Sequence, residues 1–251
     1  MNNLKLRGYV TPEDFEGSDG ERIQKAIDCA KKEDIAKVVL SGKYNTTDTI
    51  VIPGGMHVVF DNAVFTGNIQ NEIIKNYSFE SDRIYIEGKN SEIIGNIRFC
   101  HTAHVVLENL KITGNVDLEL SRFFRIEYVE ILGKLTLGRG ARDAIIQHIK
   151  ADSVLMSGED KGYDIIGREP IIKNIVLRDS EIKNGVLLNA SETCGFLNVQ
   201  VNGVVSQTTC VTVGEKGNVL PKEQYQNMTF VDNTAPKKVE FNNEYTYAYI
   251  D

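Results

Sequence analysis

The segment KNIVLRDSEI, from Lys173 to Ile182, holds the pattern that decides the fold. Its apolar residues alternate with polar ones, as they do in a strand with one buried face, and a polar Asp179–Ser180 pair then precedes a further apolar residue. The same outline recurs before and after this segment. The short apolar heads are VVL from Val38, VVF from Val58, IYI from Ile84, VVL from Val105, RIEYV around Ile126, AIIQHI around Ile146, IVL from Ile175, VQV from Val199 and MTF from Met228.

The spacing of these heads indicates a repeat architecture. Successive heads begin 20 to 29 residues apart, and several of the steps are 20 or 21 residues long. A leucine-rich repeat needs an L-x-x-L-x-L frame, and a propeller blade needs about 40 residues, so neither fits. The spacing therefore predicts an all-β chain: a single-stranded, right-handed parallel β-helix (a β-solenoid) in which each coil holds about three short strands.

One helix is predicted ahead of the coils, in SDGERIQKAIDCAKK at residues 18–32. Its apolar residues Ile23, Ala26, Ile27 and Ala30 form one helical stripe, and the serine and glutamate that precede the stripe have capping-box spacing. The open end of a coil stack is a sheet edge that must be covered. We therefore expect this helix to cap the N-terminal end.

The whole chain, residues 1–251, is expected to form one β-helix domain. The capping helix is placed at about 18–33, the coils at about 36–233, and the tail at 234–251. The tail alternates tyrosines (Tyr245, Tyr247 and Tyr249) with other residues. We expect it to pack along the flank or to cover the far end of the stack, and a contact within an oligomer is the alternative.

Composition and charge exclude several classes of function. The formal net charge is −7, which argues against nucleic acid as a partner because phosphate binding needs Lys and Arg patches. No apolar run is long enough to span a bilayer, and the first residues lack the apolar core of a secretory signal. We therefore expect no membrane partner, no signal peptide, and a cytoplasmic or phage- or virion-associated location.

The cysteines and histidines predict no metal site and no cofactor. The four cysteines form no C-x-x-C pair, and we expect them to be buried free thiols. The four histidines form no ligand constellation, although His101 and His104 lie three residues apart. No phosphate-binding glycine loop and no G-x-S-x-G motif is present.

The segment YVTPEDFEGSDGERIQKAIDCAKKEDIAKVVLSGKYNTTDTIVIPGG, from Tyr9 to Gly55, resembles the opening of pectin-lyase-like β-helix proteins. These proteins include polygalacturonases, pectate lyases and phage tailspikes, and they share a cap helix, then V.(I/L)..G.Y, then L.IP. The matching positions are fold residues and not catalytic ones. They are Asp19, Gly20, Ile23, Gln24, Ala26, Ile27, Asp28, Ala30, Gly42, Tyr44, Ile52 and Pro53.

A second segment, MSGEDKGYDIIGREPIIKNIVLRDSEIKNGVLLNASETCGFLNVQV, resembles glycoside hydrolase family 28, the polygalacturonase family. The matching positions are Ser157, Gly158, Gly167, Pro170, Asn174, Ile175, Arg178, Asp179, Gly185, Ser191, Glu192, Gly195, Asn198 and Val199. The resemblance implies an oligo- or polysaccharide partner and hydrolysis by two carboxyl groups. The family's catalytic motifs are missing, however: KNGVLL lacks the GHG histidine, TCVTVGEKGNV lacks the RIK pair, and the loop for the aspartate pair is absent.

Several Asp and Asn residues follow the strand heads at similar distances, and they predict a ladder of turns. The aligned residues are Asn109, Asp152, Asp179, Asn202 and Asp232. These residue types tolerate left-handed backbone and form hydrogen bonds with the nearby main chain. The alignment therefore assigns Asp152 and Asp179 to turns and not to catalysis.

The candidate site is built around the polar insertion GEDKGYDIIGRE, residues 158–169, because long loops on a regular scaffold are where sites are usually built. We predict Asp143 and Asp160 as the catalytic pair. The predicted substrate-binding residues are Arg142, Glu159, Lys161, Tyr163, Asp164, Arg168 and Glu192. A solvated surface loop is the alternative for the insertion.

Three hypotheses remain open from the sequence. The first is a polygalacturonase-like glycoside hydrolase with a rearranged acid pair. The second is a non-catalytic carbohydrate-binding or structural β-helix, and the third is a subunit of a phage-spike-like trimer. The expected assembly is accordingly a monomer or a homotrimer.

Overall fold

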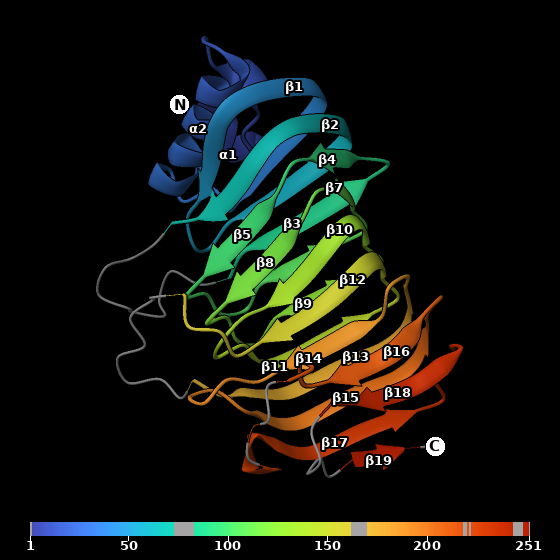
Figure 1. Ribbon diagram of the computed structural model, residues 1–251. Helices are drawn as coiled ribbons and strands as arrows, with labels where there is room; N and C mark the ends of the chain where they lie inside the picture. Colours follow the sequence, from blue (N-terminus) through green and yellow to red (C-terminus); the bar gives the residue numbers. More distant parts are fainter. Residues whose placement is uncertain are drawn as a thin grey trace.

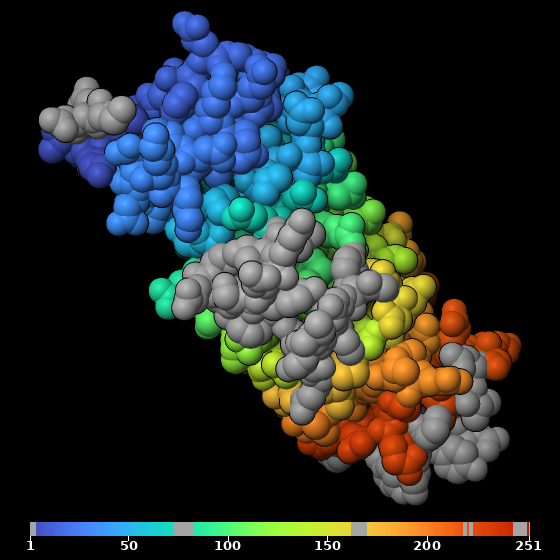
Figure 2. All heavy atoms as spheres, turned by 90° about the vertical axis from the view of Figure 1, so that its left-hand side faces the viewer, coloured from blue at the N-terminus to red at the C-terminus, as the bar shows by residue number. Residues whose placement is uncertain are grey.

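The structure is a computed structural model that describes residues 2–72, 83–161, 170–217, 220, 222–242 and 248–250. Figure 1 shows one elongated stack of strands with the two N-terminal helices at one end. Figure 2 shows that the chain runs in order along the long axis of this stack. The helices are α1 (Asn2–Arg7), η1 (Pro12–Asp14), α2 (Asp19–Lys32) and η3 (Lys222–Gln224).

The strands from β3 to β9 hold three to five residues each, and several of the strands before and after them are longer. They are β1 (Lys37–Ile52), β2 (His57–Asn71), β3 (Tyr85–Lys89), β4 (Glu92–Ile94), β5 (Ile97–Cys100), β6 (Val106–Glu108), β7 (Lys111–Thr113), β8 (Val116–Glu119), β9 (Arg125–Glu127), β10 (Glu130–Leu137), β11 (Arg142–Gln147), β12 (Lys150–Ser157), β13 (Ile172–Ile182), β14 (Val186–Asn189), β15 (Phe196–Val205), β16 (Thr209–Val213), β17 (Tyr225–Val231), β18 (Lys237–Phe241) and β19 (Ala248–Ile250).

The pairings between named strands are all parallel, and nearly every one joins a strand to its equivalent in the next coil. One register runs unbroken through His57, Tyr85, Val106, Arg125, Ile145, Val176, Gln200, Thr229 and Tyr249. The predicted parallel β-helix is therefore confirmed as the architecture. A complete coil passes through three faces with a corner after each, and several of the longer strands continue round a corner from one face to the next.

We name the faces by the order in which each coil visits them. Face A holds β3, β6, β9, β11, β17 and β19 with the first parts of β1, β2, β13 and β15. Face B holds β4 and β7 with the middle of β1 and β2, the starts of β10 and β12, and the ends of β13 and β15. Face C holds β5, β8, β14, β16 and β18 with the ends of β1, β2, β10 and β12. The A/B, B/C and C/A corners lie between the faces.

The core is a column of aliphatic and aromatic side chains inside the coils. Alternate residues of a strand point to opposite sides, so one residue of each pair enters the column. On face A the inward column is Val58, Ile86, Leu107, Ile126, Ile146, Leu177, Val201 and Phe230, all of them buried. Stacking these residues rung over rung removes their apolar surface from water, which is the main force that holds the coils together.

Helix α2 packs on β1 at the N-terminal end of the stack (Figure 1). Ser18 Oγ accepts a hydrogen bond from Glu21 N–H, and Ser18 N–H donates to Glu21 Oε2 at 2.9 Å, which is the predicted capping box. The Gln24 amide bonds both main-chain groups of Val51, at 2.9 and 3.0 Å. The helix therefore buries its apolar stripe and also satisfies part of the free edge of β1.

The A/B corner is a column of residues with left-handed backbone. Its members are Asn62, Asn90, Asn109, Tyr128, His148, Asp179, Gly203 and Asp232, with φ between +49° and +63°. The predicted turn role is thus confirmed for Asn109, Asp179 and Asp232. The other two are not members of this corner: Asn202 precedes the corner glycine, and Asp152 lies in a different turn, the one that follows face B, where its Oδ1 accepts from Asn184 Nδ2 at 3.0 Å.

The B/C corner carries a glycine and a polar residue in four successive coils, a motif that the sequence reasoning missed. The pairs are Gly67–Asn68, Gly95–Asn96, Gly114–Asn115 and Gly133–Lys134. Each Asn side chain accepts the main-chain N–H of the equivalent residue one coil later, at 3.0, 2.9 and 2.9 Å. A Cβ on Gly114 would lie 2.6 Å from the carbonyl carbon of Gly95 and closer still to its oxygen, so this corner is sterically reserved for glycine.

The C-terminal tail continues the stack. β18 pairs with β16 and β19 pairs with β17, so strand pairing extends past residue 233, where the sequence predicted the coils to end. Tyr245 and Tyr247 lie outside the described residues. All four cysteines are free, and burial raises the pKa of Cys194 and Cys210 to about 11, which keeps these thiols protonated and unreactive. No helix in the described part of the chain is long and apolar enough to cross a bilayer.

Candidate functional site

The C/A corner is where the longer coils hold most of their additional residues. The chain leaves face C at Leu137, Ser157 and Asn189 and returns to face A through loops of different length. Of the predicted substrate-binding residues, Glu159, Lys161 and Glu192 lie in these loops, as does the predicted catalytic Asp160.

An open cavity of about 720 Å³ lies at this corner, beside the outer side of face C. Three of the predicted residues line it together: Glu159, Asp160 and Glu192. The rest of the lining is Lys134, Leu155, Ser157, Leu187, Asn189, Ala190, Ser191, Glu215 and Leu220. We call this the C/A cavity.

The sequence reasoning missed a buried acid next to this cavity. Glu119 ends β8 and is 2% exposed, and Asp117 lies two residues earlier on the same strand. Residues two apart on a strand point to the same side, so both carboxylates project outward from face C. Lys161 Nζ lies 3.0 Å from Glu119 Oε2 and 3.4 Å from Asp117 Oδ1, and it covers the pair.

A glycine one coil later makes room for the Glu119 carboxylate. A side chain at Gly138 would occupy the space that this carboxylate fills. Arg139 follows and is only 7% exposed, and its guanidinium forms an ion pair with Asp160. We call Asp117, Glu119, Arg139 and Lys161 the buried cluster. Asp160 connects it to the C/A cavity, because Asp160 lines the cavity and pairs with Arg139.

The electrostatics of Glu119 differ from those of a surface carboxylate. Burial raises its pKa above the ordinary value and outweighs the lowering by Lys161, and Asp117 raises it further by like-charge repulsion. For Lys161, burial lowers the pKa, but the two carboxylates outweigh it and leave the pKa raised. Glu119 is thus an acid that holds its proton to higher pH than usual, beside a permanent cation.

The predicted pair Asp143 and Asp160 has two different surroundings. Asp143 lies on β11 with φ +56°, and its Oδ1 accepts from Asn174 Nδ2 at 2.7 Å. Asn198 donates to Asn174 in the same way at 2.9 Å, and Asn227 donates to Asn198. Asp143 is therefore the first member of an amide ladder along the start of face A, and neither it nor Arg142 is among the residues that line the C/A cavity.

The remaining predicted residues, Tyr163, Asp164 and Arg168, lie outside the described residues. Within the part of the chain that the structure describes, no group of three or more His, Cys, Asp or Glu residues could hold a metal ion. The missed cluster had a weak signal in the sequence: VDLE places two acids on one side of a strand, and Gly138-Arg139-Gly140 follows one coil later. Only the fold brings Lys161 over them.

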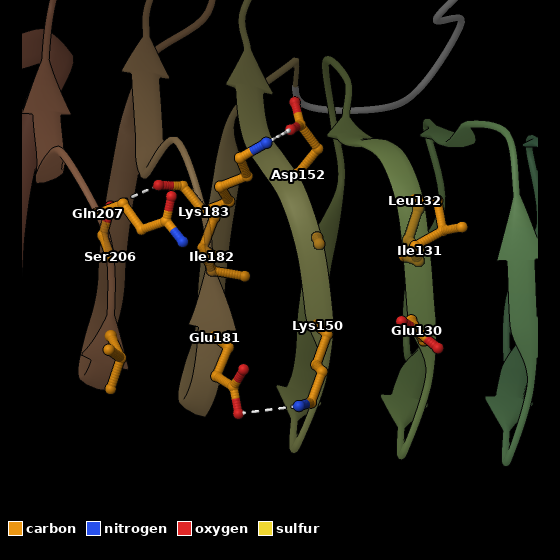
Figure 3. A pocket seen from close by; sticks show the side chains of 12 residues that line it. Glu130, Ile131, Leu132, Lys150, Asp152, Glu181, Ile182, Lys183, Ser206 and Gln207 are labelled. Carbon is orange, nitrogen blue, oxygen red and sulfur yellow. Dashed lines mark hydrogen bonds and ion pairs between the residues drawn. The ribbon is translucent and has the colours of Figure 1, made fainter.

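A second hollow, of about 340 Å³, lies on face B and is drawn in Figure 3. Four of its five charged side chains are paired with one another, and Glu130 is the fifth. Lys150 Nζ lies 3.1 Å from Glu181 Oε1, and Lys183 Nζ lies 4.0 Å from Asp152 Oδ1. Ser206 Oγ donates to the Lys183 carbonyl at 3.2 Å. This hollow offers few unsatisfied polar groups to a ligand, so we place the candidate site at the C/A corner.

No protein-family model matches the chain, and no curated protein matches it. Solved structures of similar fold do exist. A crystal structure of PfbA, a surface adhesin of Streptococcus pneumoniae, matches with a TM-score of 0.60 and 10% identity over 95% of this chain and 81% of the adhesin. A mutant tailspike of Escherichia coli bacteriophage HK620, solved with a pentasaccharide, matches with a TM-score of 0.53 and 8% identity over 100% of this chain and 66% of the tailspike. At these identities the likeness shows the fold alone, a parallel β-helix.

Proposed function

We propose that this chain is a carbohydrate-active β-helix protein that binds an oligo- or polysaccharide in the C/A cavity and hydrolyses it with Glu119 as proton donor. The observation that carries the proposal is the state of Glu119: a buried carboxyl with a raised pKa, beside a second carboxylate and covered by Lys161, which directly follows the cavity-lining Asp160 in the chain. Such a combination in a hollow is a physical marker of a functional acid. The right-handed sense of the coils, which the family resemblance implies, is part of the same proposal.

The upper bound on the separation of the two acids falls within the range that glycoside hydrolysis uses. Because both carboxylates contact Lys161, their nearest oxygens are at most about 6.4 Å apart, and glycosidase carboxyl groups lie about 5 to 9.5 Å apart. Glu119 would protonate the leaving oxygen, and Asp117 would act as base or nucleophile. Lys161 must swing aside to admit the glycosidic oxygen, and its side chain is 30% exposed and joined to four flexible methylenes.

The predicted residues take supporting roles in this proposal. Asp160, Glu159 and Glu192 line the cavity, where carboxylates accept hydrogen bonds from sugar hydroxyls. Asp143 is assigned to the amide ladder, because its carboxylate is already bonded to Asn174.

The charge of the cavity favours a neutral glycan over polygalacturonate. Among the residues that the structure describes, its lining holds four acids, Glu159, Asp160, Glu192 and Glu215, against one cation, Lys134. A polyuronate would bring further negative charge into this field, which disfavours binding. The substrate proposed here therefore differs from that of the polygalacturonase family, although a segment of the sequence resembles it. The pentasaccharide in the tailspike structure supports a glycan as the partner class.

The test is release of reducing ends from xylan, galactomannan, mixed-linkage β-glucan and polygalacturonate. We expect turnover of at least one neutral polysaccharide. The turnover rate should fall at least about 100-fold in Glu119→Gln, because the variant lacks the general acid. Glu181→Gln is the matched control, because Glu181 is an exposed acid on face B. Unchanged turnover in Glu119→Gln would refute the assigned role.

A non-catalytic carbohydrate-binding protein is the second candidate. The observation that favours it is the ion pair between Glu119 and Lys161, which closes over the acid as a structural pair would. Binding of a neutral glycan that weakens in Glu192→Gln, without release of reducing ends from any of the four polymers, would select this alternative.

A further inference from the structure

The A/B corner departs from its own pattern in two adjacent coils. In the other coils with left-handed backbone at this corner the residue is Asn, Asp or Gly. In the coils of β9 and β11 it is Tyr128 and His148, with φ +54° and +52°. Asn, Asp, Gly and His tolerate this backbone, whereas for tyrosine it is a strained conformation. The turn itself therefore gives no reason for the tyrosine ring.

Core packing does not explain the rings either. Tyr128 is 54% exposed, and His148 is exposed as well. The two rings stack on each other with centroids 5.0 Å apart and planes 11° from parallel. The tyrosine thus presents a flat aromatic face that His148 supports. A strained residue kept on the surface points to a function that needs it there.

A groove of about 670 Å³ runs past this pair. Its lining comes from four successive coils and is mainly polar: Glu87, Gly88, Lys89, Asn90, Ser91, Asn109, Leu110, Lys111, Tyr128, Val129, Glu130, His148 and Lys150. We call it the A/B groove. It shares no residue with the C/A cavity.

The lysines of the A/B groove are neutralised by their neighbours. Lys111 pairs with Glu92 at 3.0 Å, Lys89 with Asp61 at 3.7 Å, and Lys150 with Glu181 of the next coil. The groove therefore lacks the unpaired positive charge that a phosphate or a polyuronate would need. What it offers is an aromatic plane, amide groups on Asn90 and Asn109, and polar ends of charged side chains.

We propose that the A/B groove is a second glycan-binding surface, separate from the C/A cavity, and that it takes a neutral oligosaccharide. The apolar C–H face of a sugar ring stacks on Tyr128, and its hydroxyls bond Asn90, Asn109 and the charged rim. A protein partner fits less well, since a stable protein interface needs an apolar core and about 1,200 Å² of buried surface, whereas Tyr128 is the one large apolar side chain of the described lining that is broadly exposed.

The experiment is native affinity electrophoresis of the full chain in gels that contain xylan, galactomannan, hydroxyethylcellulose or polygalacturonate. We expect at least one neutral polymer to retard the protein. Tyr128→Asn removes the stacking ring and should raise the dissociation constant at least about tenfold, which corresponds to a loss of about 1.4 kcal/mol of binding free energy. Tyr128→Phe keeps the ring, and its dissociation constant should stay within about twofold of that of the unmodified protein. Leu132→Ala is the control, because Leu132 lies in the same coil, is 52% exposed and does not line the groove.

A thermal scan of Tyr128→Asn separates binding from structure. Asn is the residue that other coils use at this corner, so the melting temperature should be equal to or above that of the unmodified protein. A lower melting temperature with unchanged retardation would show that the ring pair only stabilises the stack, and would overturn the proposal. Retardation by polygalacturonate alone, by none of the polymers, or a Tyr128-dependent dimer would overturn it too. Loss of hydrolysis in Glu119→Gln is independent of all these outcomes.

Discussion

Replacing Gly114 by alanine tests the steric reading of the B/C corner. Gly114 has no left-handed backbone, so alanine brings no conformational strain of its own. Its Cβ, however, would lie 2.6 Å from the carbonyl carbon of Gly95, where ordinary contact begins at 3.4 Å. One coil must therefore move by at least about 0.8 Å relative to the other, or the corner must open.

The surrounding hydrogen bonds resist that movement. Gly95 N–H donates to the Thr113 carbonyl at 3.1 Å, and Asn115 N–H donates to Asn96 Oδ1 at 2.9 Å. Both bonds join the two coils that the new methyl group would push apart. We therefore expect the free energy of unfolding to fall by about 3 kcal/mol, which is the upper end of the usual cost of overpacking a core.

Urea unfolding followed by far-UV circular dichroism measures this loss. Gly8→Ala is the control: there φ is +74° and no atom lies within 4 Å of the added methyl group, so left-handed strain alone should cost about 1 kcal/mol. If Gly114→Ala unfolds within about 0.5 kcal/mol of the unmodified protein, the corner is not clamped as described.

Three further predictions concern single side chains. Because the pKa of Glu119 is raised on folding, the unmodified protein loses stability as the pH rises above the ordinary carboxyl value. The difference in melting temperature between Glu119→Gln and the unmodified protein should therefore shift in favour of the variant as the pH is raised above that value in thermal scans. A constant difference would contradict this. Asn115→Ala removes the acceptor that lies 2.9 Å from Lys134 N–H, and it should lower the free energy of unfolding in urea by about 1 kcal/mol. An unchanged free energy of unfolding would show that this bond does not stabilise the B/C corner. Asp152→Ala loses one exposed bond to Asn184 and should cost at most about 1 kcal/mol by the same assay, with reducing-end release unchanged.

The fold was predictable because its signal is local and repeated. Each coil must send apolar residues inward at a period of two, and the steps of 20 or 21 residues between strand heads fix how the coils stack. The stripe of α2 and its capping box are equally local. The turn at Asp152 was misplaced because counting from the strand heads cannot distinguish the A/B corner from the turn after face B.

The candidate site was predictable only in part. Glu159, Asp160 and Glu192 were placed together because the insertion breaks the repeat, and they do line one cavity. Glu119 was missed because an acid at the end of an alternating strand reads as a solvent-facing residue. Its burial depends on Gly138 one coil later and on Lys161 two coils later, which is information that no local pattern contains.

Most of the additional length in the longer coils sits at the C/A corner, outside the ladder of strands. Exchange of a loop there changes no rung and no core side chain. Ligand preference and scaffold stability are therefore encoded by largely different residues. A transplanted loop that keeps Asp160 and Lys161, the partners of buried Arg139 and Glu119, should leave the melting transition in place while altering what the cavity accepts.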